Sequence, residues 1–134
     1  QNGAASIKLI QDETREALAA SDAAAVASGT ATLEAALLET PMVVVYKESA
    51  VNWHTLGRLI TVSHYGLLNL VAGKEVAREL MQNDLTGANV AEELLKLLEP
   101  NINKSTRHQL AEVARKLGHS GASERAAEAI INSL

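Results

Sequence analysis

Ala27-Ser28-Gly29-Thr30-Ala31-Thr32-Leu33-Glu34 is the stretch that decides the fold, because it joins two short apolar segments at residues 22–27 and 42–46. The second segment, Met-Val-Val-Val-Tyr, is a continuous Val-rich run typical of a central strand in a parallel sheet covered on both faces. We expect the first segment to be a strand as well, although its alanines prefer helix. A helix from Thr30 to Leu38 connects the two strands, and the unit predicts an α/β fold with a partial doubly wound parallel sheet.

The N-terminal and middle regions are predicted from their local patterns. Ser6–Ile10 is strand-like, and Asp12 can cap a helix over Glu13–Ala20. We expect Gly66–Gly73 to be irregular. The spacing over Asn52–Ile60 predicts a helix whose apolar side consists of Trp53, Leu56 and Ile60. We expect this side to contact the core or an interface.

The C-terminal third is predicted to be helical. Thr86 can cap a helix over Gly87–Leu98. Asn103 can cap the next helix, which continues through Leu117 and stops at Gly118. The last helix repeats the apolar spacing of an amphipathic helix at Ala127, Ile130, Ile131 and Leu134. Each of these apolar faces needs an element to cover it.

Composition and charge narrow the function classes. With 134 residues, of which 47% are hydrophobic, the chain can bury one core. Its twelve Lys and Arg are scattered and its net charge is −4, which argues against a nucleic-acid partner. The absence of cysteine excludes disulfides, thiolate metal sites and cysteine nucleophiles. No run approaches the roughly 18 apolar residues of a membrane span, so we expect a cytoplasmic protein.

Catalytic and metal-binding motifs are missing from the sequence. The histidines have neither metal-ligand spacing nor a partner in triad order, and we expect them at the surface or at helix caps: His54, His64, His108 and His119. Asp22 and Asp84 are interpreted as turn and cap residues. We therefore predict no metal, no cofactor and no catalytic residue in this chain.

The Ser28-Gly29-Thr30 loop is the first candidate binding site. Gly29 allows close backbone approach, and the two hydroxyls lie beside the first amides of a helix, where an anionic ligand could sit. The alternative is that the loop only caps the helix. Glu34 lies one helical turn beyond Thr30 and could bind ribose hydroxyls or steady the loop, or it could be an ordinary solvated helix residue.

Two blocks of sequence carry a family resemblance. The first is Ala27–Leu38, continued by Pro41–Lys47, and the second is Asn69–Glu75, followed by Glu79–Gln82. In this order and separation the blocks resemble the C-terminal half of lipid-A-disaccharide synthases, a family of bacterial glycosyltransferases that use a UDP-linked acylated sugar. The similarity runs from about Thr14 to about Leu98, with a weaker match at residues 123–127.

The resemblance implies a fold and an activity. It implies the Rossmann-like C-terminal half of a GT-B glycosyltransferase, with residues 1–120 in a nucleotide-sugar-binding domain and residues 121–134 as a helix that packs on an N-terminal domain outside this chain, or on a partner. The implied reaction is inverting transfer of diacylglucosamine from UDP to diacylglucosamine 1-phosphate. The acceptor site and the catalytic carboxylate belong to the other domain, so we expect this fragment to bind UDP weakly without turnover.

The resemblance also implies which residues bind the UDP-diacylglucosamine donor: Ser28, Gly29, Thr30, Glu34, Asn69, Gly73, Lys74 and Glu75. Asn69 has an alternative interpretation as a turn residue that bonds its own backbone. The chain departs from the family pattern at Ala50 and Leu68, where proline is usual, and at Lys74, where arginine is frequent. Lysine keeps the charge but loses the bidentate fork of arginine.

Other function classes remain open. Another UDP-sugar enzyme of the GT-B type, or a UDP-N-acetylglucosamine epimerase, would keep the nucleotide site and change the acceptor. A non-enzymatic α/β interaction module would bind no nucleotide, and exposed apolar helices could also form a homodimer. For the synthase, the lipid acceptor implies peripheral association of the full-length protein with the inner membrane.

Overall fold

A three-stranded parallel sheet is the centre of the molecule. The structure is a computed structural model that describes residues 5–47, 64–118 and 121–133. The strands are β1 (Ala24–Ala27), β2 (Met42–Tyr46) and β3 (Glu79–Met81), in the order β1-β2-β3. Ala24 pairs with Met42, and Val44 pairs with Glu79. The α/β class is confirmed, and so are the central strand and the alanine-rich strand.

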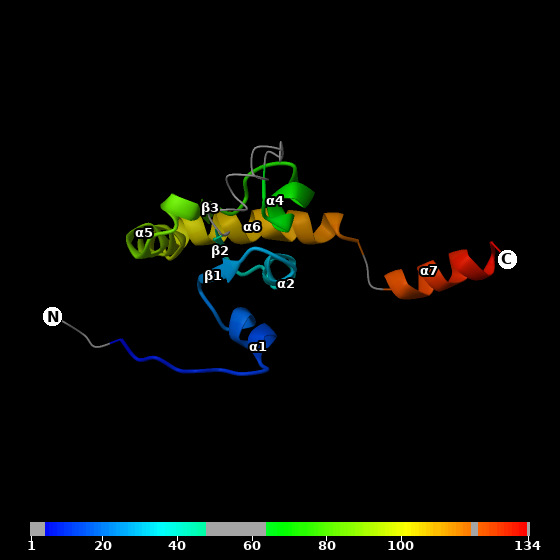
Figure 1. Ribbon diagram of the computed structural model, residues 1–134, viewed down its shortest axis with the longest axis horizontal. Coiled ribbons are helices and arrows are strands. Elements are labelled where there is room, and N and C mark those ends of the chain that lie inside the picture. The colour runs from blue at the N-terminus through cyan, green and yellow to red at the C-terminus, as the bar shows by residue number, and fades with distance from the viewer. Residues whose placement is uncertain (1–4, 48–63, 119–120, 134) are drawn as a thin grey trace.

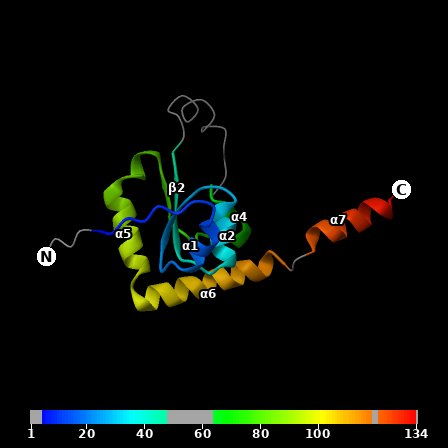
Figure 2. The same cartoon turned by 90° about the horizontal axis from the view of Figure 1, so that it is seen from below.

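Helices cover both faces of the sheet. The helices α2 (Ala31–Leu37), α4 (Leu67–Ala72) and α6 (Pro100–Lys116) pack against one another, whereas α5 (Gly87–Leu97) packs against β1 and β2. Figure 2 shows α5 on one side of β2 and α2 with α4 on the other, while α6 runs across one end of the sheet. The shorter α1 (Thr14–Ala19) packs on α2, and a 3-10 turn, Gln82–Asp84, follows β3.

Small and aliphatic residues fill the core between these layers. Val43 and Val44 are both buried although consecutive strand residues point to opposite faces, so β2 is covered on each side. On α2, Ala35 and Ala36 are fully buried, and on α6 Leu110 is fully buried. Alanine at the helix surface lets α2 approach its neighbours closely, which explains how a chain with few aromatic residues closes its core.

The prediction of a strand at Ser6–Ile10 is wrong. Residues 5–10 pair with none of the described strands, and the side chains of Ile7 and Leu9 are 93% and 94% exposed. Figure 1 shows this segment running along the α1 side of the molecule, away from the sheet. Apolar side chains favour extended backbone, but a strand also needs a neighbour that accepts its hydrogen bonds.

The prediction that Gly66–Gly73 is irregular is also wrong, because this segment contains α4. Its two glycines lie at the ends of the helix: Gly66 is the N-cap, and Gly73 is the C-cap with a left-handed φ of 72°. Left-handed backbone at the end of a helix is a common use of glycine. The intervening residues are mostly good helix formers, so the glycines mark the limits of a helix.

Two of the three predicted cap residues are wrong. The N-cap of α1 is Glu13, and Asp12 precedes it with a φ of 62°. The helix α6 begins at Pro100, because proline suits the first helical turn, and Asn103 lies inside it. Thr86 is confirmed as the N-cap of α5, since its hydroxyl accepts a hydrogen bond from the Asn89 amide at 3.1 Å.

The C-terminal end of α6 and the presence of a last helix agree with the sequence-based prediction. The helix α6 stops at the predicted place, and Gly118 follows it with a φ of 83°. The last helix is α7 (Ala122–Ile131), where Ile130 and Ile131 are 63% and 69% exposed; Figure 1 shows α7 standing apart from the sheet. The predicted helix at Asn52–Ile60 lies outside the described residues, and the domain boundary near residue 120 stays a prediction.

A side-chain network from α6 fastens the amino edge of the sheet, where the loops enter β1 and β2. Arg107 donates from Nη1 to the Glu39 carbonyl at 2.9 Å and from Nη2 to the Ser21 carbonyl at 3.2 Å. Its Nε donates to Asn103 Oδ1 at 2.8 Å, and Asn103 Nδ2 donates to the Asp22 carbonyl at 2.8 Å. One planar guanidinium therefore joins both incoming loops to α6.

Candidate functional site at the carboxyl edge of the sheet

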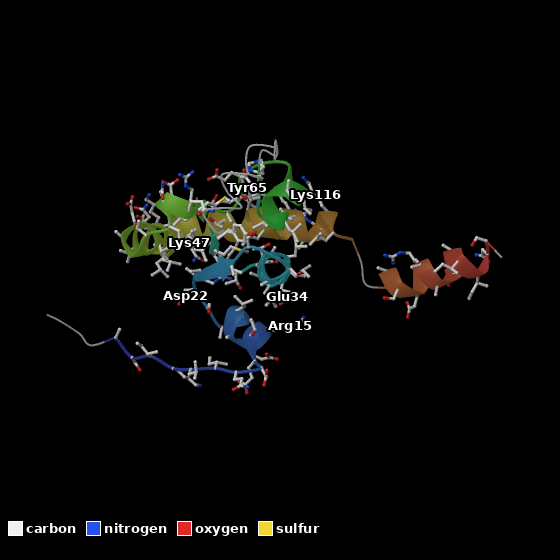
Figure 3. All side chains as sticks on the ribbon, viewed as in Figure 1. Arg15, Asp22, Glu34, Lys47, Tyr65 and Lys116 are labelled. Carbon is white, nitrogen blue, oxygen red and sulfur yellow. The ribbon has the colours of Figure 1, made fainter. Side chains whose placement is uncertain are left out.

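The carboxyl edge of the sheet lies opposite this network and carries the Ser28-Gly29-Thr30 loop. Open parallel sheets bind ligands outside the carboxyl ends of their strands. Ser28 directly follows β1, and its amide donates to the Val45 carbonyl of β2 at 2.9 Å. Lys47 directly follows β2 and is exposed, which gives this edge a cation (Figure 3).

The loop has hydrogen-bond donors that the rest of the described chain does not use. Within the described residues, no acceptor bonds the amides of Gly29, Thr30 and Ala31, the last residues before and at the start of α2. Thr30 is the N-cap residue but makes no side-chain capping bond, and Ser28 bonds elsewhere. Neither hydroxyl therefore caps α2 through its side chain, and ligand binding by the loop stays a prediction.

Gly29 gives the loop its shape. Its φ is 150°, a value that residues with a Cβ atom rarely adopt, although open space surrounds the position where a Cβ would lie. The constraint on this residue is conformational. The loop is also closed internally, because Thr32 Oγ1 donates to the Gly29 carbonyl at 2.7 Å. Glycine and this bond together define the backbone path into α2.

The start of α4 lies beside this loop. Ser28 Oγ donates to the Tyr65 carbonyl at 3.5 Å, and α2 packs against α4. At 3.5 Å the bond is long, so its importance is to show that the two segments are adjacent. Gly66 follows, and a Cβ there would lie 3.1 Å from Glu79 Oε1 and 3.6 Å from Val44 Cγ1. The absence of a side chain lets the start of α4 approach the sheet.

Asn69 joins α4 to the segment that enters β3. Its side chain is 0% exposed. The Oδ1 atom accepts from the amides of Val76 at 2.8 Å and Ala77 at 3.1 Å, and Nδ2 donates to the Ala77 carbonyl at 2.7 Å and to Glu79 Oε1 at 2.8 Å. These four bonds use the full capacity of an amide side chain. All four bonds go to residues 76–79, whereas a turn residue would bond its own backbone.

Gly73, Lys74 and Glu75 lie at the other end of α4. Lys116 of α6 donates from Nζ to the Ala72 carbonyl at 3.0 Å, which fixes that end (Figure 3). Glu75 lies 3.5 Å from Arg78, and both side chains are about half exposed. The structure does not bring this end of α4 beside Ser28, and the role of these three residues in donor binding stays a prediction.

Glu34 lies on the exposed side of α2. It lines a shallow recess of about 210 Å³ with Arg15, Leu37 and Leu38. Figure 3 shows Glu34 beside Arg15 and apart from Tyr65. Glu34 follows Thr30 by one helical turn, as predicted, since its amide donates to the Thr30 carbonyl at 3.2 Å. Its assignment to the donor site stays a prediction.

The residue that sequence reasoning missed is Glu79. Its carboxylate accepts hydrogen bonds from three donors of the 65–69 segment: the amides of Tyr65 and Gly66, each at 2.9 Å, and Asn69 Nδ2 at 2.8 Å. The available signal was an acidic residue directly before the buried Leu80. A carboxylate that enters a sheet needs donors nearby, and the sequence does not reveal which donors these are.

Metal chemistry and membrane insertion find no support in the described residues. No group of three or more His, Cys, Asp or Glu side chains could hold a metal ion in that part of the chain. Among the described helices, none combines the length and the apolar character that crossing a bilayer requires.

A three-stranded parallel sheet with crossover helices defines a partial Rossmann-like α/β domain. Sequence comparison then gives the family. The family model described as lipid-A-disaccharide synthetase matches residues 1–132. The chain belongs to the lipid-A-disaccharide synthetase family, as the two sequence blocks predicted.

Three relatives illustrate the similarity, each named lipid-A-disaccharide synthase. The protein of Syntrophus aciditrophicus is 48% identical over 122 residues, covering 90% of this chain and 32% of the relative. Those of Solibacter usitatus and Myxococcus xanthus are 45% and 40% identical, covering 96% and 94% of this chain and 34% and 33% of the relatives. The chain thus spans about a third of the length of these relatives.

Proposed function

We propose that this chain supplies the sugar-nucleotide donor site of a lipid-A-disaccharide synthase. The observation that carries the proposal is the Ser28-Gly29-Thr30 loop at the carboxyl edge, with three amides that no described residue bonds. Backbone amides at the start of a helix are suited to anionic groups such as a diphosphate. The exposed Lys47 adds positive charge at the same edge.

The proposed reaction is an inverting glycosyl transfer. A hydroxyl of diacylglucosamine 1-phosphate attacks the anomeric carbon of UDP-diacylglucosamine, a new C–O bond forms, and the bond to the diphosphate breaks. The electron pair leaves with UDP, whose increasing negative charge the loop amides stabilise. The proton of the attacking hydroxyl passes to a base that we place in the rest of the full-length enzyme, together with the acceptor site.

The remaining residues of the proposed site have more distant roles. Asn69 acts by holding α4, since its polar atoms are fully bonded. Glu34, Gly73, Lys74 and Glu75 are kept as predicted donor contacts. Because the acceptor is a lipid, we place the full-length enzyme at the cytoplasmic face of the inner membrane. The chain by itself binds UDP without forming disaccharide.

Titration of the ¹⁵N-labelled chain with UDP tests this proposal. We expect saturable shifts of the backbone amides of residues 28–31 and 65–66, and none at the amino-edge residues Asn103 and Arg107. Uridine, which lacks the diphosphate, is the matched ligand control, and it should shift the loop amides far less. An absence of saturable shifts with millimolar UDP, or shifts confined to other regions, would contradict the proposal.

An interaction module is the second candidate, and the exposed face of α7 favours it. Ile130 and Ile131 are largely exposed on a helix that stands apart from the sheet. This candidate predicts no response to UDP and association of the chain at rising concentration. Sedimentation equilibrium of the chain and of the Ile130→Ser variant separates the two: a homodimer through α7 would weaken in the variant, whereas the donor-site proposal predicts equal UDP affinity for both.

A further inference from the structure

The Glu79 carboxylate supplies the acceptors that the start of α4 lacks. Its Oε2 accepts from the Tyr65 amide at 2.9 Å, and its Oε1 accepts from the Gly66 amide at 2.9 Å. The first amides of a helix have no partner within the helix. Glu79 belongs to β3, so a strand residue holds the N-cap of a helix that begins more than ten residues before it in the chain.

Asn69 fixes the orientation of that carboxylate. Its Oδ1 is held by the amides of Val76 and Ala77, and this directs Nδ2 towards the Ala77 carbonyl and Glu79 Oε1. Glu79 therefore has three N–H donors on two oxygens, all from the 65–69 segment. A network in which each member is bonded holds a single arrangement.

Tyr65 transmits this arrangement to the donor loop. Its amide is held by Glu79 on one side, and its carbonyl accepts from Ser28 Oγ on the other. The backbone at Tyr65 thus lies between the carboxylate and the loop with unused amides. Gly66 adds a constraint on spacing, because a Cβ there would lie only 3.1 Å from Glu79 Oε1.

We propose that Glu79 is a positioning residue of the donor site, which sets the distance between the Tyr65-Gly66 backbone and the Ser28-Gly29-Thr30 loop. This inference rests on the proposed donor-binding function. We assign Glu79 to positioning, because each of its oxygens accepts from protein N–H groups of the 65–69 segment. It acts through the backbone that forms one wall of the site.

Glu79→Gln is the decisive variant. The Gln oxygen keeps the bonds from Gly66 and Asn69, whereas its NH₂ group faces the Tyr65 amide, donor against donor. We expect UDP to bind about tenfold more weakly, the effect of losing one hydrogen bond to a charged group, and the Tyr65 amide proton to shift upfield. Removing a negative charge near a bound diphosphate would by itself strengthen binding, so the expected change has the opposite sign from simple electrostatics.

Two controls separate positioning from general effects on charge and stability. Glu112→Gln makes the same charge change at a half-exposed side chain of α6. Thr40→Val removes a buried hydrogen bond at the amino edge, where the hydroxyl donates to the Leu18 carbonyl at 2.8 Å. Both variants should keep the UDP dissociation constant within about twofold of wild type, provided that Thr40→Val is measured below its melting transition, because neither touches the carboxyl edge.

Gly66→Ala is the second test, and it leaves the carboxylate intact. The new methyl group would lie 3.1 Å from Glu79 Oε1 and displace the carboxylate. We therefore expect UDP binding to weaken severalfold. If the wild-type chain does not bind UDP, the proposed donor site is refuted, and the role of Glu79 is refuted with it. Wild-type binding with equal affinity in Glu79→Gln overturns the positioning role alone. If Thr40→Val weakens UDP binding as much as Glu79→Gln does, the positioning role is also overturned, because the loss of affinity would then result from the loss of stability.

Discussion

Side chains of a distant helix hold the amino edge of the sheet. At the carboxyl edge, by contrast, a loop whose backbone donors no described residue bonds lies beside the N-cap of α4, which Glu79 holds. At the amino edge, Arg107 and Asn103 occupy the carbonyls of the loops that enter β1 and β2. At the carboxyl edge, Glu79 accepts from the amides of Tyr65 and Gly66, just before α4, but no described residue bonds those of Gly29 to Ala31. Protein hydrogen bonds hold the first edge, whereas the second has donors that the proposed ligand would use.

The largest expected effect breaks the amino edge. Arg107→Leu keeps part of the stem but removes three hydrogen bonds, two of them to loop carbonyls. We expect the free energy of unfolding to fall by about 3 kcal/mol, since hydrogen bonds to charged groups contribute most when partly buried. Urea denaturation measures this change. UDP affinity of the folded variant should stay at the wild-type value.

Arg115→Leu is the matched control for that prediction. Arg115 is an exposed residue in the last turn of the same helix. Its replacement should change the unfolding free energy by no more than about 0.5 kcal/mol. If Arg115→Leu destabilised the chain as much as Arg107→Leu, the loss would come from α6 itself, and the contrast between the edges would fail.

A smaller effect is expected at the carboxyl edge. Gly29→Ala forces a residue with a Cβ into a φ of 150°, which costs about 1–2 kcal/mol of strain or changes the loop conformation. We expect UDP binding to weaken more than stability does. Isothermal titration calorimetry and urea denaturation of the same sample give the two numbers.

Gly87→Ala provides the comparison for Gly29. Gly87 is the first residue of α5 and has open space around its Cβ position. Alanine there should stabilise the helix slightly, by up to about 1 kcal/mol, with unchanged UDP affinity. A loop variant that bound UDP as tightly as wild type would show that the unusual backbone at Gly29 has no part in the site.

The smallest effect concerns the surface of α5, away from both edges. Lys96 lies 2.8 Å from Glu92, and its hydrogen bond, and then its charge, lower the pKa of the Glu92 carboxyl below the ordinary 4.5. A lowered pKa contributes stability above pH 4.5, and this stability is lost as the pH falls further. Lys96→Met should therefore reduce the difference between the urea midpoints at pH 7 and pH 3. The reduction should be small, because the pair is exposed.

The strength of the local pattern explains which parts of the fold were predictable. The apolar run at Met42–Tyr46 could only be satisfied by a strand buried on both faces, and this strand then required the crossover helix before it. The glycines at 66 and 73 misled the prediction, because glycine punctuates helices as readily as loops. The start of α6 was misplaced because the helix begins at Pro100, three residues before the predicted cap Asn103.

The candidate site was predictable where it consists of one local segment. The Ser28-Gly29-Thr30 loop was found because its residue types and its place after a strand are visible in the sequence. Glu79 was missed because its meaning depends on donors 10 to 14 residues away. The full bonding of Asn69 depends on the same docking of α4 against β3. When a residue is buried by tertiary packing, its burial cannot be predicted from its neighbours in the sequence.

The dependence of α4 on Glu79 has a consequence for the order of folding. A helix of six residues is far too short to persist alone in water, and its N-cap Gly66 gains the Glu79 acceptor only when β3 has joined the sheet. We therefore expect α4 to form late, after β1 and β2 have paired around the α2 crossover. A nascent chain that ends before residue 79 would hold the first half of the sheet and still lack this helix.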